Sequence, residues 1–433
     1  MILSGATVVT ALDPVRVVEV DVFVEDGRIA ATGGGARHDC SGCLVVPGNV
    51  CAHTHLYSAL ARGMPYALEP PDNFLQILQR VWWRLDRALD EDAIRASALA
   101  GGLEALLSGT TTLVDHHASP NAIDGSLDVI EEALRALGIR SVLAYEVSDR
   151  DGPERAQAGI DENRRFLERV CREPSPLVRG LVGAHAAFTM SDDTLAACAA
   201  LGPLHIHAAE DRIDTGAVSR LASLGALDER TLLAHGVHLS TEELELVLKA
   251  NASIAHNARS NMNNAVGHAQ VGAMGERLAL GTDGIGSDMF EESRASYFRL
   301  HEDDLHVGAD WPLARLAASA RLAGRIFEEP LLGTLGPGAP ADLAVLDYAA
   351  PAPVRTSSFA GHWVFGLSAR SVRDVMVAGE WVVRDRHLTR ADPQELAAGA
   401  RTQADRLWRR LDEVGPHEFE PKGGRRWQAA PVA

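Results

Sequence analysis

The feature that most constrains the fold is an eightfold alternation of short apolar runs with helical stretches, which begins near Pro47. Each run has the length and composition of a buried strand and leads through polar residues into a helix-like segment. Strands that alternate with helices pair in parallel, and eight such units close into a barrel. The expected strands are the run LVVPGNV at 44–50 and residues 111–114, 141–145, 181–184, 204–206, 231–234, 253–255 and 278–281.

Both ends of the chain have the pattern of β-structure instead. Residues 18–24 alternate apolar and mostly acidic side chains, and Asp26-Gly27 offers a turn before a return strand at 28–30. Beyond Gly333 the pattern of β-structure returns at residues 343–346 and in a hairpin around Ala378-Gly379. Residues 393–411 have a helical pattern. We expect residues 1–47 and 334–433 to form a small β-sandwich with a helical tail, beside a barrel of residues 48–333.

Composition narrows the possible partners. At 433 residues the chain exceeds the roughly 250 of a simple α/β barrel, which leaves room for such an addition. The 41 basic and 59 acidic residues give a net charge of −18 without a basic stripe, so nucleic acid and anionic membranes are poor partners. No apolar run approaches the ~20 residues that span a bilayer, and the N-terminus lacks the features of a signal peptide. We expect a cytoplasmic enzyme that forms a dimer or larger homo-oligomer.

Polar residues with metal-binding or proton-transfer capacity follow nearly every expected strand. Active sites of such barrels lie at the C-terminal ends of the strands. Eight of the seventeen histidines fall at these positions, which is more than a chance distribution would place there. The residues concerned are His53, His55, His116, His117, Glu146, His185, His207, His235, His256 and Asp283.

The first of these motifs indicates a metal site. His53 and His55 are two residues apart after a strand-like run, so both imidazoles can reach one ion. The chain has only two lysines, Lys249 and Lys422, and neither follows an expected strand. A dinuclear site bridged by a carboxylated lysine is therefore excluded. Three histidines and one carboxylate would suit a single zinc or ferrous ion with a position left open for water.

Two acidic residues are candidates for moving protons. In HIHAAED, Glu210 comes three residues after His207, close enough to place a carboxyl beside a water on the metal. This spacing favours a proton shuttle over a second ligand. In LGTDGIGSD, Asp283 lies between glycines at the eighth strand end, where it could bind the metal and accept a proton from that water.

Together these motifs resemble those of the amidohydrolase superfamily, in particular its mononuclear branch of adenosine, cytosine, guanine and chlorotriazine deaminases. The likeness covers most of the chain and rests on HxH, HxHxxE, LAH, HNxxSN from His256 and TDG from Thr282, in that order. It implies that the metal ligands are His53, His55, His207 and Asp283. It further implies that Glu210 and His235 act on substrate and water.

Three further sequence segments are similar to those of the SsnA group of aminohydrolases, which is associated with purine breakdown. The segments concerned are DHHASPNAIDGSLDVI from Asp115, YEVSDRDG from Tyr145 and SDMFEE from Ser287. Four residues without a fixed role in the wider superfamily are then candidates for lining the substrate pocket: His116, His117, Glu146 and His185.

The segment FLQILQRVWWRLDRAL at 74–89 places Leu75, Leu78, Trp82 and Leu85 on one face of an expected α-helix. Trp82 or Trp83 could cover a flat heterocycle in the pocket, since indole stacks well on such rings. Packing against the barrel or a second subunit is the competing interpretation.

These observations favour a metal-dependent aminohydrolase that releases ammonia from a purine, pterin or pyrimidine-like heterocycle. In this hypothesis Glu210 protonates a ring nitrogen, and His235 stabilises the developing oxygen charge. Two alternatives stay open at this point. One is ring-opening hydrolysis of a cyclic amide by the same residues, and the other is a barrel that binds a ligand without catalysis.

Overall fold

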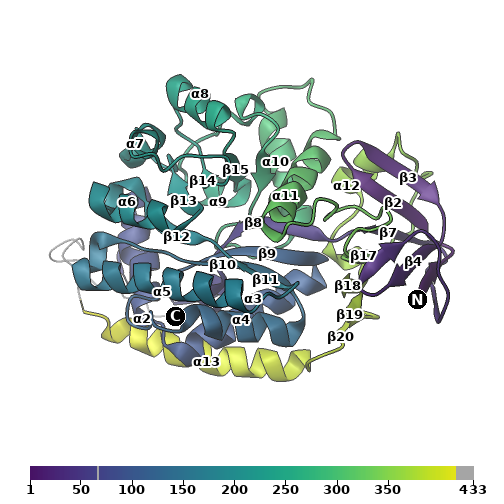
Figure 1. Ribbon diagram of the computed structural model, residues 1–433, viewed down its shortest axis with the longest axis horizontal. Helices are drawn as coiled ribbons and strands as arrows, with labels where there is room; N and C mark the ends of the chain where they lie inside the picture. The colour runs from purple at the N-terminus through teal and green to yellow at the C-terminus, as the bar shows by residue number, and fades with distance from the viewer. Residues whose placement is uncertain (66–67, 416–433) are drawn as a thin grey trace, which may run out of the picture.

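The structure, a computed structural model, describes residues 1–65 and 68–415, so Lys422 lies outside the described residues. Its centre is an eight-stranded parallel barrel surrounded by helices (Figure 1). The fold class predicted from the alternation is therefore confirmed. The barrel strands are β8 (Asn49–Thr54), β9 (Thr110–His117), β10 (Arg140–Tyr145), β12 (Val182–Ala186), β13 (Leu204–Ala208), β14 (Leu232–His235), β15 (Ser253–His256) and β16 (Leu278–Leu280).

Two sheets form the barrel wall, and isolated bridges join them. One sheet contains β8, β9 and β10 together with β11 (Val178–Gly180), and the other runs from β12 to β16 in sequence order. A parallel bridge between Thr54 and Asp283 connects β8 to the end of the β16 segment. A second bridge, between Val147 and Ala184, connects the β10 segment to β12. The strand ends therefore form one rim, as parallel closure requires.

The run LVVPGNV, expected as one barrel strand, is divided between two sheets. Residues Cys43–Pro47 form β7, which pairs with β2 and β17, and the barrel begins only at β8. Gly48 separates them, and a Cβ atom at this position would lie 2.3 Å from side-chain atoms of Thr111. Only glycine lets the chain pass this close to β9. The expectation of a single strand was therefore wrong.

The remaining strands form two sheets from both ends of the chain. One has the order β5-β4-β1-β6, and the other has the order β20-β19-β18-β17-β7-β2-β3. Figure 1 shows the purple N-terminal strands beside the green to yellow C-terminal ones. Their bounds are β1 (Ile2–Ser4), β2 (Thr7–Leu12), β3 (Val15–Glu19), β4 (Val22–Glu25), β5 (Arg28–Ala30), β6 (Arg37–Asp39), β17 (Leu343–Asp347), β18 (Val372–Val377), β19 (Glu380–Arg384) and β20 (His387–Leu388).

A separate apolar core holds these two sheets together. Leu3 and Val22 of the smaller sheet lie in one buried cluster with Val8, Val45 and Val345 of the larger sheet. This is the arrangement of a β-sandwich built from both termini. We propose the boundaries near residues 47 and 333 as the limits of the barrel.

Amphipathic helices cover the outside of the barrel. In α4 (Ser126–Leu137), Leu127, Ile130, Leu134 and Leu137 are buried, and the helix ends at Gly138 with φ of 80°. The C-terminal helix α13 packs against α3 and crosses the outside of the barrel (Figure 1). The helix bounds are α3 (Glu91–Leu107), α5 (Pro153–Arg172), α6 (Asp192–Leu201), α7 (Ala217–Ser223), α8 (Thr241–Ala250), α9 (Ala258–Asn263), α10 (Met289–His301), α11 (Trp311–Phe327), α12 (Phe359–Phe365) and α13 (Pro393–Glu413).

The predicted helix at 74–89 contains a π-helical turn. It consists of α1 (Phe74–Ile77), the π-turn η2 (Leu78–Trp82) and α2 (Trp83–Ala88). The Trp83 N–H bonds to the Leu78 carbonyl five residues earlier, so the π-turn shifts the buried face by one residue. As a result Trp83 is buried where the regular pattern placed Trp82, which is only partly buried. Before the π-turn, Phe74 is buried and Leu75 only partly buried.

None of the helices in the described residues combines the length and apolar character that crossing a membrane requires.

Candidate metal centre and active site

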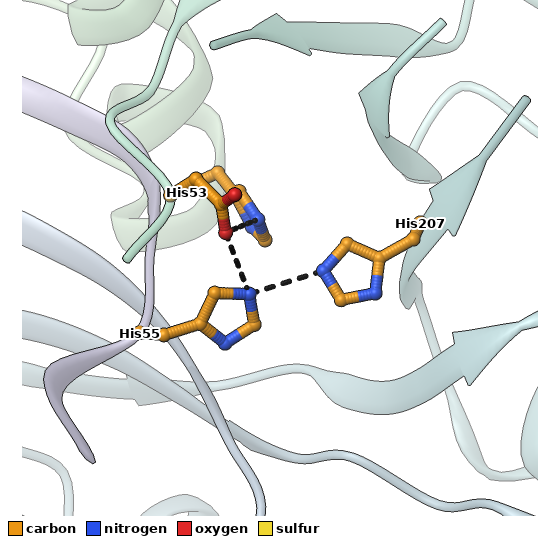
Figure 2. A group of neighbouring side chains, drawn as sticks. His53, His55 and His207 are labelled. Atoms are coloured by element: carbon orange, nitrogen blue, oxygen red, sulfur yellow. Dashed lines mark hydrogen bonds and ion pairs between the residues drawn. The ribbon is translucent and has the colours of Figure 1, made fainter. Parts of the chain in front are cut away.

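Four candidate ligands, called here the metal-donor cluster, meet at the C-terminal rim of the barrel: His53, His55, His207 and Asp283. Their donor atoms all lie within 4.8 Å of one another. The His55 Nε2 atom is 3.0 Å from Asp283 Oδ1 and 3.1 Å from His207 Nε2. Figure 2 shows the three imidazoles turned toward one another. Strands far apart in the sequence thus bring these residues together.

Hydrogen bonds at the other ring nitrogen fix which atom each histidine turns toward the cluster. His55 Nδ1 donates to the His116 carbonyl at 2.5 Å, and His207 Nδ1 donates to the His185 carbonyl at 2.8 Å. A carbonyl only accepts, so Nδ1 carries the hydrogen and Nε2 keeps its lone pair. His53 Nδ1 pairs with His205 Nε2 at 2.8 Å, and when Nδ1 is the donor of this pair the His53 Nε2 atom also keeps its lone pair. All three Nε2 atoms are then available as ligands.

Burial keeps two of these rings neutral. It lowers the pKa of His53 to about 3 and holds the pKa of His207 well below its ordinary value. The pKa of His55 is also lowered by burial, but the Asp283 carboxylate outweighs this effect and raises it to about 9. The centre of the cluster therefore favours a positive charge.

One buried atom supports a divalent cation directly. His53 Nε2 has no hydrogen-bond partner among the described residues, although burying such an atom unpaired is costly. Three imidazole nitrogens and a carboxylate are a donor set for zinc or ferrous iron. The residues present therefore fit a divalent transition metal.

The backbone around Asp283 allows the segment after β16 to lie close to β8. A Cβ atom at Gly281 would lie 2.7 Å from His53 Cβ, so this glycine allows the β16 end to lie against β8. Asp283 itself has a left-handed conformation with φ of 53°. Such positions are concentrated at functional sites. The Ser260 hydroxyl donates to Asp283 Oδ2 and fixes the second carboxylate oxygen.

On one side of the cluster, Glu210 faces His235. Glu210 Oε2 is 3.4 Å from His235 Nε2, and the Asn264 amide donates to Glu210 Oε1 at 3.4 Å. His235 Nδ1 lies 2.8 Å from Asn261 Oδ1, which orients the ring with Nε2 toward Glu210. Burial is the main cause that raises the pKa of Glu210, to about 7, and Asp283 adds to it. A carboxyl with such a pKa can take up and release a proton near neutral pH.

On the other side, Glu146 lies between two histidines. Its Oε2 is 3.2 Å from His116 Nδ1, and its Oε1 is 3.7 Å from His185 Nε2. Donor atoms of His55, His116, Glu146 and His207 form a second group within 4.8 Å of one another. Burial raises the pKa of Glu146, but His185 and His116 outweigh burial and hold the pKa below its ordinary value.

Comparison with known proteins identifies the family. The amidohydrolase family profile matches residues 44–382. The chain is 33% identical to a 5-methylthioadenosine/S-adenosylhomocysteine deaminase of Nitratidesulfovibrio vulgaris, covering 96% of this chain and 98% of the relative. The chain belongs to the amidohydrolase family.

Other relatives agree with this assignment. A 5′-deoxyadenosine deaminase of Methanopyrus kandleri is 29% identical over 92% of this amidohydrolase and 97% of its own length. An adenosine deaminase structure from Xanthomonas campestris, with bound zinc, has a TM-score of 0.82 at 23% identity, covering 94% of this chain and 98% of that one. The latter likeness shows the shared fold. This amidohydrolase is a metal-dependent aminohydrolase that acts on carbon–nitrogen bonds.

The cavity beside the metal-donor cluster has an apolar wall and several carboxyls. The apolar wall comes largely from the π-turn segment, with Phe74, Leu78, Trp82 and Trp83. Among the described residues that line the cavity there is neither lysine nor arginine. Its acidic lining residues are Asp86, Glu146, Glu210, Asp211, Asp214 and Asp283.

Sequence reasoning proposed several lining residues, and the structure places them differently. Glu146, His185 and Trp83 line the cavity of this amidohydrolase. His116 lies behind Glu146, with Nε2 bonded to the His205 carbonyl at 3.0 Å. His117 is buried and bonds through Nε2 to the Ser119 hydroxyl at 2.9 Å, and it is not among the cavity-lining residues.

Trp83 has a more restricted position than a mobile lid would have. The residue is only 5% exposed, and the Arg150 guanidinium lies 5.3 Å from the ring centroid. The ring centroid of His185 is 6.1 Å away in an edge-on arrangement. The side chain is therefore packed into the wall of the cavity, and Trp82 of the same segment also lines it.

Three residues near the cluster were not singled out from the sequence. His205 contacts His53, Ser260 bonds to Asp283, and Asn264 bonds to Glu210. A signal for His205 was present, because HIHAAED repeats the two-residue spacing of His53 and His55. Asn264 follows the HNxxSN motif by three residues, directly after α9, and had no such signal.

Proposed function

We propose that this amidohydrolase replaces the exocyclic amino group of an adenosine-like purine or related heterocycle with oxygen and releases ammonia. The observation that carries the proposal is Glu210, a buried carboxyl beside His235 and the metal-donor cluster. The deaminase names of the relatives, which cover nearly all of the chain, support this choice of substrate class.

We further propose that the metal-donor cluster holds one zinc ion, with ferrous iron as the alternative. When bound, such an ion lowers the pKa of a water molecule and polarises it for attack. His53, His55 and His207 would bind through Nε2 and Asp283 through its carboxylate. The chain's own hydrogen bonds at Nδ1 set the rings for this role in advance.

The residues around the cluster would then move the protons. Glu210 takes a proton from water and gives it to the ring nitrogen next to the reacting carbon. His235 Nε2 lies beside Glu210, where it can stabilise the developing negative charge on oxygen when protonated. Glu210 then takes the second water-derived proton from the new hydroxyl group and gives it to the departing amine. The apolar wall with Trp82 and Trp83 would hold the flat ring and exclude water.

Isotope labelling tests this proposal against the ring-opening alternative. A panel of amino-substituted purines, pterins and pyrimidines is incubated with the zinc-loaded protein in ¹⁸O-water. We expect ammonia in equal amount to product, with the label at the carbon that carried the amine. Label in the carboxylate of an opened ring, without ammonia, would replace deamination by cyclic-amide hydrolysis. No product from the panel would favour a barrel without catalysis.

Four sequence predictions go beyond these observations. Membership of the SsnA group, a cytoplasmic location and a homo-oligomeric state stay predictions. The same is true of a role in purine breakdown.

A further inference from the structure

We infer that Glu146 accepts a hydrogen bond from the leaving amine and thereby selects substrates whose leaving group carries N–H. This inference rests on the proposed deamination. It assigns Glu146 a part in choosing the group that departs, whereas Glu210 moves the protons.

The position of Glu146 is the first step of the argument. One of its carboxylate oxygens lies within 4.8 Å of the donor atoms of His55 and His207. It belongs to the part of the rim formed by β9 and β10, whereas Glu210 follows β13. A substrate bound at the cluster would thus have Glu210 on one side and Glu146 on the other.

The second step is that the Glu146 carboxylate is buried and that the described residues give it ion-pair contacts with histidine but no hydrogen bond. The residue is 6% exposed and lines the cavity. His116 Nδ1 is 3.2 Å from Oε2, but it makes no hydrogen bond among the described residues, and His185 Nε2 is too distant at 3.7 Å. A desolvated carboxylate without a donor is costly unless a ligand supplies one.

Hydrogen bonds at their other ring nitrogens also fix the two histidines beside Glu146. His116 Nε2 bonds to the His205 carbonyl and His185 Nδ1 bonds to the Thr189 hydroxyl, so neither ring can turn away from Glu146 without losing a bond. An ionised carboxylate accepts hydrogen bonds and donates none. An amino group offers N–H to such an acceptor, whereas a methoxy or chloro substituent on the same carbon offers only lone pairs.

The reaction balances without a proton on Glu146. The water oxygen forms a bond to the ring carbon, and the carbon–nitrogen bond breaks. Of the two water hydrogens, one ends on the ring nitrogen and the other leaves with ammonia, both carried by Glu210. No group is oxidised or reduced. Glu146 accepts N–H of the amine in the substrate and N–H of ammonia as it departs.

Pairs of substrates that differ only in the leaving group test the inference. Each amino heterocycle of the panel is compared with its methoxy counterpart by kcat/KM, for the wild type and Glu146→Gln. We expect the amino-to-methoxy ratio to fall by about 10- to 100-fold in the variant, since a hydrogen bond to a charged acceptor is lost. Glu154→Gln, an exposed glutamate at the start of α5, is the control and should leave the ratio unchanged.

Metal content provides a readout independent of activity. Elemental analysis should give the same metal content for wild type and Glu146→Gln. If the wild type holds two ions per chain and the variant one, Glu146 is a metal ligand and the inference fails. An unchanged ratio with normal ammonia release would overturn the inference alone. Absence of ammonia from every wild-type reaction would overturn the proposed function as well.

Discussion

Glu210 and Glu146 are both buried glutamates that follow barrel strands, and each faces histidine beside the metal-donor cluster. Their pKa values nevertheless move in opposite directions. Burial raises the pKa of both. At Glu210 burial outweighs the lowering by His235, and the nearby Asp283 carboxylate adds to the rise. At Glu146, the histidines on its two sides outweigh burial and lower the pKa.

The comparison shows that residue type and burial do not decide the role of a carboxyl. What decides it is the charge of the groups that share its pocket. A glutamate with a pKa near 7 can exchange protons during turnover, whereas one held ionised acts as a fixed acceptor. The predictions below test this division of roles, from the largest expected effect to the smallest.

The largest effect is expected at His207, a proposed metal ligand between the Glu210 side and the Glu146 side of the cluster. His207→Ala should remove bound metal and ammonia release together, because the ring contributes one of four proposed ligands. Elemental analysis and the ammonia assay measure both, with His387→Ala, an exposed histidine in β20, as control. Full metal content in inactive His207→Ala would place the residue outside the ligand set. Two firmly held ions in the wild type would contradict the single-metal proposal.

Next in size is the proton-transfer side. Glu210→Gln should keep the metal and fold but lower turnover by about 10² to 10⁴, the usual contribution of a positioned acid-base group. Steady-state kinetics, elemental analysis and circular dichroism are the measurements. Near-normal turnover would refute the shuttle and remove the contrast with Glu146. Loss of metal would make Glu210 a ligand.

A smaller effect is expected at His205, which contacts the proposed ligand His53. His205→Gln should weaken metal binding by about 10- to 100-fold, because His205 orients the Nδ1 side of His53. Competition with a chelator gives the metal affinity. His256→Gln is the matched control, a buried barrel histidine on β15 that bonds to none of the four ligands in the described residues. Equal affinity in both variants would show that the His205 contact has no orienting role.

The smallest effect concerns Asn264, which donates to Glu210 at 3.4 Å. Asn264→Ala should lower turnover about fivefold, since a net hydrogen bond of this kind contributes roughly 1 kcal/mol. Asn121→Ala, an exposed asparagine before α4, serves as control in the same kinetic assay. An unchanged rate would mean that Glu210 keeps its position without this amide. A loss as large as that of Glu210→Gln would assign Asn264 a direct part in catalysis.

Local patterns predicted the barrel strands well, but they misplaced one strand boundary and one buried helix face. The run at 44–50 is uniformly apolar, so nothing local distinguishes the end of β7 from the start of β8. The close approach of Gly48 to Thr111 decides the division. In the segment at 74–89, the π-turn places Trp83 instead of Trp82 on the buried face. Such a turn leaves no periodic signal, because it changes the period only once.

The sequence by itself determined the barrel and the rim on which the polar residues gather. Strand and helix periods are local properties, and the C-terminal ends of parallel strands meet at one edge whatever their distance along the chain. The proposed ligands could therefore be named from position and resemblance. Only the tertiary structure decided which carbonyls accept from His55 and His207 and where His117 lies. It alone also decided which way the pKa of Glu210 and Glu146 moves. These properties depend on contacts between different strands, which no local pattern contains.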